Sequence, residues 1–186
     1  MMKKFFGHLK TILIHKWWVF YYCCKLDIPW RGLVHDLSKF SPVEFWEGVK
    51  YYQGNSSPIN AAKKEQGYSL AWQHHKGRNP HHYEYWIDNL DSGGKPIKMP
   101  YKYMLELIAD YLAAGKTYNG KDFTFMQEFE WWDSVKLGKK MHLGTETTID
   151  IILHDLATST NVNKTFKLYR KDKKESEYYY NRFLNH

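Results

Sequence analysis

Residues 32–40, with the sequence GLVHDLSKF, contain a histidine followed directly by an aspartate, His35 and Asp36. An imidazole and a carboxylate together suit a divalent transition-metal ion such as Mn, Fe, Ni or Zn. Successive helical residues point about 100° apart, so this pair can converge on one ion only at a helix end or kink. Lys39 could then reach a metal-bound phosphate as a point charge. A solvated pair on a helix surface is the alternative interpretation.

A second segment, WQHHKGRNPHHYEYW over residues 72–86, holds four histidines within nine residues. His75 ends one expected helix and His82 lies near the start of the next, so both could face one point across the turn. His74 and His81 have the same spacing of seven residues. At most one histidine of each adjacent pair needs to be a ligand, and the others could bind phosphate or orient a ligand. A polar, histidine-rich turn is the alternative.

The same turn carries polar residues that could bind substrate. Lys76 and Arg78, together with Lys39, could neutralise the charge that develops on phosphoryl oxygens. Asn79 precedes a proline, which is the pattern of a helix cap, but its side chain could also hydrogen-bond substrate. We therefore expect a substrate-binding group made of His74, Asn79 and His81.

Two further residues complete the candidate ligand set. Asp110 borders the apolar stripe of an expected helix, and a buried carboxylate there needs a cation. Glu106 lies four residues earlier, and two like charges at that spacing disfavour the helix slightly. His15 lies beside the apolar stripe of the first expected helix. Taken singly, a solvated acid and a packed histidine are the more common interpretations. A second His-Asp pair, at residues 154–155, lacks a nearby lysine and indicates an ordinary amphipathic helix.

Helical periodicity dominates the chain, and few segments alternate with period two, so the sequence predicts an all-α fold. Ser41, Pro42 and Glu44 have the pattern of a helix start with a capping box. The expected loops are 53–58, 91–96 and 115–121. The expected helices are 3–24, 31–40, 42–52, 60–76 with a break at Gly67, 80–90, 100–114, 122–136 and 145–158.

Composition limits the possible classes of protein. The 186 residues suit one domain, which we expect over 1–160, followed by a basic, tyrosine-rich segment over 161–186. With 27 Lys and Arg against 20 Asp and Glu, the net charge is +7, which favours an anionic partner such as phosphate, a nucleotide or nucleic acid. The two cysteines are adjacent, so we expect no disulfide framework and a cytoplasmic location. The longest uncharged stretch near the start, residues 17–24, is too short to span a membrane.

The ordered set of histidines and acids resembles the HD-domain metal-dependent phosphohydrolase superfamily. Its pattern is a His, then His-Asp, sometimes further His, and a distal Asp, all on helices around a metal. The segments GLVHDLSKFSPVEFW, AWQHHKGRNPHHYEYW and KMPYKYMLELIAD are similar to a family of uncharacterised bacterial and phage proteins. Carried over residue by residue, the resemblance implies one or two metal ions held by His15, His35, Asp36, His75, His82 and Asp110.

The resemblance also implies an activity. A metal-activated water would hydrolyse a phosphomonoester or phosphodiester, with a nucleotide as the expected substrate. Some relatives with two metals carry out oxygenase chemistry instead. Two other classes stay open: a non-catalytic module that binds nucleic acid or another partner through residues 164–174, and a structural protein stabilised by metal.

Overall fold

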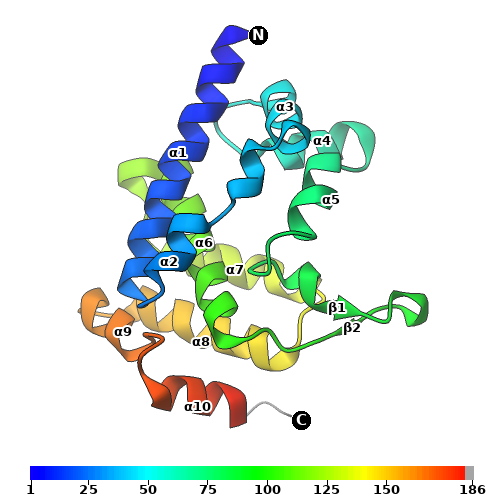
Figure 1. Cartoon of the computed structure of the whole chain (residues 1–186). Coiled ribbons are helices and arrows are strands. Elements are labelled where there is room, and N and C mark those ends of the chain that lie inside the picture. Colours follow the sequence, from blue (N-terminus) through cyan, green and yellow to red (C-terminus); the bar gives the residue numbers. More distant parts are fainter. Residues whose placement is uncertain (183–186) are drawn as a thin grey trace.

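The computed structural model describes residues 1–182, which form a bundle of ten α-helices with one short β-hairpin (Figure 1). The all-α class is therefore confirmed. The strands β1 (Ile87–Asp88) and β2 (Lys95–Pro96) pair antiparallel. No helix within residues 1–182 combines the length and the apolar character needed to cross a bilayer. The α-helices are α1 (Met2–Lys25), α2 (Pro29–Val34), α3 (Pro42–Tyr51), α4 (Pro58–Gln66), α5 (Leu70–Lys76), α6 (Tyr101–Asn119), α7 (Phe125–Val135), α8 (Leu143–Thr158), α9 (Val162–Leu168) and α10 (Lys174–Arg182).

The helix α6 runs through the centre of the hydrophobic core. Apolar residues occupy nearly every position of its middle turns, which is the pattern of a helix covered on several sides. The helix α1 packs along α6, and both carry polar residues that reach the candidate site. The fully enclosed side chains of α6 include Met104, Leu105, Leu107, Ile108 and Leu112.

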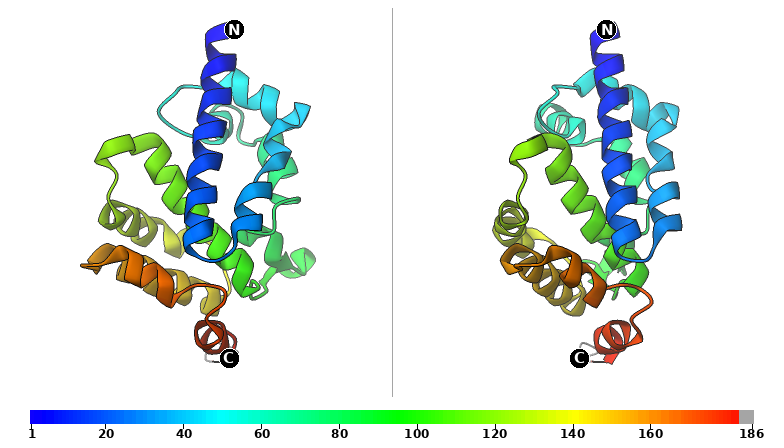
Figure 2. Two further views of the ribbon diagram at one scale, coloured as in Figure 1. Left: turned by 60° about the vertical axis from the view of Figure 1, so that its left-hand side comes forward. Right: turned by 90° about the vertical axis from the view of Figure 1, so that its left-hand side faces the viewer.

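The helices α7 to α10 lie at the end of the bundle opposite the N-terminus of α1, whereas α3, α4 and α5 lie together on one side of α1 (Figure 2). Phe166 of α9 and Tyr180 of α10 belong to the same buried cluster as the core of α6. The hydroxyl of Tyr180 donates to the backbone carbonyl of Met99. The segment after residue 160 is therefore packed on the bundle, and residues 183–186 lie outside the described part of the chain.

The His-Asp pair lies at a helix end, as helical geometry requires if both side chains are to reach one point. The helix α2 ends at Val34, and a 3-10 turn, η1 (Leu37–Phe40), follows the pair. Asp36 has a φ of 52°, in the left-handed region that costs a non-glycine residue on the order of 1 kcal/mol or more. Lys16 of α1 donates its ammonium to the carbonyl of His35 and helps to hold this turn.

The expected helix over residues 80–90 is wrong. Only a 3-10 turn, η2 (Tyr83–Trp86), forms there, and β1 follows it directly. Asn79 does not cap a helix, because its side chain donates to Ser38 Oγ and to the carbonyl of His75, both at 2.8 Å. Glycines with positive φ at 93 and 94 then allow the tight turn between the strands.

Other boundaries agree with the expectation only in part. The expected break at Gly67 within 60–76 is confirmed, because Gly67, with a φ of 81°, ends α4. The expected loop over 115–121 is wrong for most of its length, since α6 continues to Asn119. Ser41 and Pro42 do begin α3, but Ser41 makes no side-chain capping bond and Glu44 turns toward the candidate site instead.

Candidate metal centre

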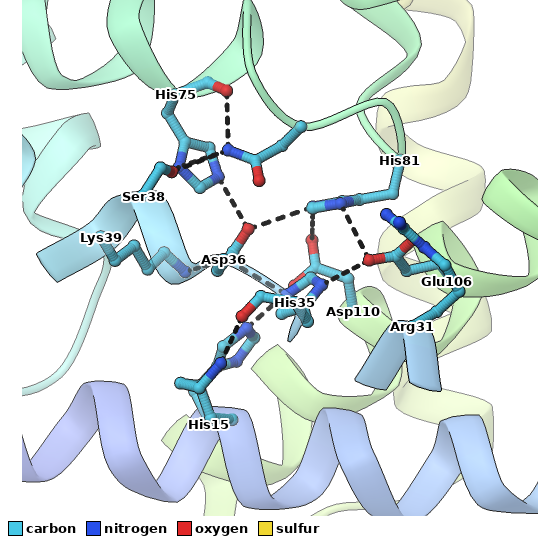
Figure 3. A network of polar contacts seen from close by, with 12 residues as sticks. His15, Arg31, His35, Asp36, Ser38, Lys39, His75, His81, Glu106 and Asp110 are labelled. Carbon is cyan, nitrogen blue, oxygen red and sulfur yellow. Dashed lines mark hydrogen bonds and ion pairs between the residues drawn. The ribbon is translucent and has the colours of Figure 1, made fainter. Parts of the chain in front are cut away.

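Two groups of buried histidines and carboxylates meet at Asp36 (Figure 3). In each group, the candidate ligand atoms all lie within 4.8 Å of one another. Group 1, which we define by its residues, contains His15, His35, Asp36 and Asp110. Group 2 contains Asp36, His75, His81 and His82.

Group 1 joins three parts of the fold. His15 comes from α1, Asp110 from α6, and His35 and Asp36 from the turn after α2. The Nε2 atom of His15 lies 2.9 Å from Oδ1 of Asp110, and the same oxygen lies 3.5 Å from Nε2 of His35. The His35 Nε2 atom also lies 3.1 Å from Oδ2 of Asp36. Four side chains thus point their ligand atoms at one small volume.

Group 2 lies on the other side of Asp36. The Oδ1 atom of Asp36 is 3.2 Å from Nε2 of His75 and 3.4 Å from Nε2 of His81. The His82 ring packs beside both, with ring centres 4.8 Å and 4.1 Å away. The two oxygens of Asp36 therefore face different sets of histidines, an arrangement that suits a carboxylate shared by two ions.

Glu106 orients one histidine from each group. Its Oε1 atom lies 3.0 Å from Nδ1 of His35 and 3.3 Å from Nδ1 of His81. Its other oxygen accepts a 2.6 Å hydrogen bond from Nε of Arg31. A carboxylate on Nδ1 fixes the ring tautomer and leaves Nε2 free to bind metal, as is common around metal-binding histidines.

Glu44 orients His75 in the same way, by a contact with its Nδ1 atom. Its two oxygens lie 2.7 Å from Nδ1 of His75 and 2.6 Å from Nδ1 of His74. Ser38 Oγ, at 3.2 Å from the same His75 nitrogen, and the Asn79 amide pack around it. Because these partners hold Nδ1 of His75, its Nε2 atom points toward Asp36.

The protonation states show how the cluster balances its charge. Burial alone would raise the pKa of Asp36, but the charges of His35, His75 and Lys39 outweigh it and hold that pKa well below its usual value. Burial would lower the pKa of His75, yet Asp36 and Glu44 raise it to about 9. The pKa of His35 is raised well above normal, against the effect of burial, by Asp36, Asp110 and Glu106.

The donor set fits a divalent transition metal. Several buried polar atoms at the centre lack a hydrogen-bond partner even though they approach each other closely, and unpaired buried polar atoms are costly. A cation between them would satisfy these atoms, since neutral imidazoles and carboxylates are ligands of Mn, Fe, Ni and Zn. The atoms are Nε2 of His15, His35, His81 and His82 and Oδ1 of Asp36. The other oxygen of Asp36 is paired with the Lys39 ammonium.

Comparison with known proteins adds a family but no activity. Residues 4–158 match a family described as a family of unknown function, DUF5662. The chain belongs to the DUF5662 family. No curated protein and no solved structure matches the chain significantly. The matched span contains both groups and the two carboxylates that orient them, so the whole cluster lies within the part of the chain that defines this DUF5662 protein.

In this DUF5662 protein, the structure brings together all six residues that the sequence indicated as metal ligands. It also places Lys39 at the centre, with its ammonium 2.6 Å from Oδ2 of Asp36. His81, expected on the substrate side, instead has its Nε2 atom directed at Asp36. The six are His15, His35, Asp36, His75, His82 and Asp110.

Four other expected residues lie away from the centre. The His74 ring turns to Glu44 on the outer side of α5. Arg78 is exposed, and its guanidinium donates to the carbonyl of His74 at 3.3 Å. Lys76 is half-buried and does not line the cavity beside the site. Asn79 is buried, and its side chain donates a hydrogen bond to the backbone carbonyl of His75.

Sequence reasoning missed the two orienting carboxylates. Glu106 was visible as an acid within a strongly apolar helix, which is a signal for a buried partner. Its partners His35 and Arg31 lie 71 and 75 residues away in the chain, so spacing could not reveal them. Glu44 has a capping position by sequence, and that interpretation concealed its contact with His75.

Proposed function

We propose that this DUF5662 protein is a metal-dependent phosphohydrolase of the HD type, acting on a phosphomonoester or phosphodiester. The observation that carries the proposal is the division of Asp36, whose Oδ2 atom faces His35 and whose Oδ1 atom faces His75 and His81. Together with the order of His, His-Asp, His and distal Asp along the chain, this supports a site for one or two divalent ions. A phosphorylated small molecule or nucleotide is the expected partner.

The residues of the two groups and the carboxylates beside them would have different roles. Group 1 and group 2 would each hold one ion, with Asp36 shared between them. When bound, divalent ions supply Lewis acidity that activates water and polarises a phosphoryl oxygen. Glu106 and Glu44 keep the histidine Nε2 atoms directed inward. Their role is positioning, because their carboxylates are bonded to the Nδ1 atoms of His35 and His75.

Lys39 is the cation best placed to act on a phosphoryl group. Burial would lower its pKa, but Asp36 and Asp110 raise the pKa to about 12, so the ammonium stays charged at neutral pH. It lines the cavity beside the metal groups. Lys76 and Arg78, which the sequence suggested for the same role, do not line that cavity. The proposal therefore assigns charge neutralisation to Lys39 alone.

Elemental analysis tests the proposal, on protein purified without added metal or a metal-binding tag. We expect about one or two transition-metal ions per chain, lost in Asp36→Ala because Asp36 belongs to both groups. His75→Ala should lose at most one ion. Asp155→Ala is the matched control, because it alters the second His-Asp pair, where both side chains are about half exposed. Metal-free wild-type protein, even after reconstitution with Mn²⁺, Fe²⁺ or Zn²⁺, would overturn the proposal.

The activity itself is tested with a panel of phosphate esters in the presence of Mn²⁺ or Fe²⁺. Hydrolysis should disappear in Asp36→Ala and fall strongly in Lys39→Ala. Oxygen consumption with Fe²⁺ and no phosphate release would instead favour the oxygenase chemistry that the same donor set suits.

The structure gives little support to the alternative that the protein binds nucleic acid through its basic segment. Arg170 lies 3.1 Å from carboxylate oxygens of both Asp27 and Asp172, and Lys171 pairs with Glu177. The basic segment after residue 160 is therefore partly neutralised within the bundle. Nucleic-acid binding that weakens steeply with salt and survives in Asp36→Ala would nonetheless favour that alternative.

A further inference from the structure

A cavity of about 210 Å³ lies directly beside the two metal groups. Four of its lining residues are candidate ligands, namely His15, His75, His82 and Asp110. It is bounded by α1, α3, α4, α5 and α6. Pockets for drug-sized ligands are usually about 300–1,000 Å³. The cavity therefore suits a small molecule that reaches the metal groups with one end.

The surface of the cavity is mainly apolar. Ile12 of α1, Ile59 of α4 and Ala114 of α6 contribute aliphatic surface. Trp72 of α5 contributes an aromatic face, and its ring is held in place by stacking on His75 and by the Lys63 ammonium 4.7 Å from the ring centre. A ligand portion without charge would bury apolar surface here and gain affinity from it.

The charged side chains that line the cavity are already bonded to other protein groups. Lys39 is the only lysine or arginine among the lining residues, and it is bonded to Asp36. The lining carboxylate of Glu44 is bonded to histidines, and Glu47 accepts from the backbone amides of Leu70 and Ala71 at 3.1 and 3.2 Å. His8 is a lining residue whose pKa burial lowers to about 4, so it is neutral at pH 7. The cavity has no further cation to balance a second or third phosphate.

From this lining we infer that the cavity binds the uncharged, apolar part of a small phosphate monoester, and that nucleoside diphosphates and triphosphates are poor ligands. The inference rests on the proposed function, because it takes the metal groups and Lys39 as the place of the single phosphoryl group. It narrows the expected substrate from nucleotides in general to a monoester whose other half is an aromatic ring or a short hydrocarbon.

Isothermal titration calorimetry on the metal-loaded protein tests this with phenylphosphonate, which resists hydrolysis, against inorganic phosphate and ATP. Phenylphosphonate should bind about tenfold or more tighter than phosphate, since its ring fills the apolar part of the cavity. ATP should bind no more tightly than phosphate. Equal or tighter binding of ATP relative to phenylphosphonate would overturn the inference.

Variants that fill the cavity locate the binding. Ala114→Leu should reduce the preference for phenylphosphonate over phosphate to about twofold or less, with phosphate binding unchanged. Thr117→Leu, at a half-buried lining position on the same helix, gives a second test if the first variant folds poorly. The matched control is Ala157→Leu on α8, also half-buried but outside the lining, which should keep the full preference.

Different results would overturn the proposed phosphohydrolase function and the assignment of the cavity. If phenylphosphonate shows the expected preference but no phosphate ester is hydrolysed, the proposed function is overturned and the cavity assignment stands. If phosphate esters are hydrolysed but neither filling variant alters the phenylphosphonate preference, the cavity assignment is overturned and the function stands.

Discussion

Glu106 and Asp110, four residues apart on α6, hold the same imidazole from opposite sides. Glu106 lies 3.0 Å from Nδ1 of His35, and Asp110 lies 3.5 Å from its Nε2 atom. On an isolated helix, two acids at this spacing repel each other by a few tenths of a kcal/mol. Here both carboxylates face histidines or Arg31, so one turn of α6 supplies a candidate ligand and the group that orients another candidate ligand.

Replacing Glu106 with glutamine should weaken metal binding at both groups. The amide would keep the size of the side chain but lose the charged acceptor that holds His35 and His81. Loss of such an outer partner typically costs 10–100-fold in metal affinity, which is about what we expect for Glu106→Gln. Competition against a chelator of known affinity measures the change. Glu130→Gln, an exposed exchange on α7, is the matched control.

Replacing Glu44 with glutamine should affect one ion only. Glu44 contacts Nδ1 of His75, which belongs to group 2, and contacts no residue of group 1 among its hydrogen bonds within residues 1–182. We expect the ion of group 2 to be lost on dialysis from Glu44→Gln, while the ion of group 1 stays bound. Measuring the metal content per chain checks this. His74→Ala should leave both ions bound, because the His74 ring faces Glu44 and not Asp36. Equal loss of both ions in Glu44→Gln would contradict this division.

The sequence placed the His-Asp pair within one expected helix over 31–40, which is wrong because α2 ends at Val34 and η1 begins at Leu37. Helical geometry correctly indicated that the pair can converge only at such an end, and the order of the candidate ligands followed from the resemblance to the HD superfamily. The choice within each histidine pair could not be made the same way. His74 and His75 both lie in the last turn of α5 and both contact Glu44, so neither their spacing nor that acid distinguishes them. Only the packing of α5 in the fold shows that the Nε2 atom of His75 faces Asp36. His81 and His82 both reach Asp36 from an irregular segment, where no periodicity indicates direction.

The cations were harder to predict than the ligands. Lys76 and Arg78 are close to the histidines in sequence, but the direction of α5 places them away from the cavity. Lys39 lies at the centre because the 3-10 turn η1 brings its ammonium back to Asp36, three residues earlier in the chain. Short-range spacing therefore predicted a contact within one turn and failed for contacts that depend on how helices pack.

Metal affinity should rise with pH across the neutral range. The pKa of His75 is raised to about 9 and that of His35 is raised well above normal, so both rings carry protons at pH 7 when no metal is present. A metal ion must displace these protons, and log K should therefore rise by up to about two per pH unit between pH 6 and 8. Titrations at several pH values, with the chelator's own pH dependence subtracted, measure the slope. A flat profile would mean that the histidines are already neutral.

Glu128 should make the protein less stable as pH rises from about 5 to 8. Its carboxyl is buried between α7 and Gly115 of α6, and burial, with a smaller effect of Asp110, raises its pKa to about 8. The folded state thus keeps a proton that the unfolded state releases above its ordinary pKa of 4.5. Over that interval the unfolded state binds fewer protons, so the free energy of unfolding falls by roughly 1.4 kcal/mol per pH unit.

Chemical denaturation of chelator-treated protein at pH 5, 6.5 and 8 would show this dependence, and comparison with Glu128→Gln would isolate it. The variant lacks the titrating group, so the difference in unfolding free energy between variant and wild type should move in favour of the variant as pH rises. Glu130→Gln, on the exposed side of the same helix, should show no such trend. A constant difference between wild type and Glu128→Gln from pH 5 to 8 would mean that Glu128 is already ionised at pH 5 in the folded protein, with its carboxylate stabilised by its surroundings.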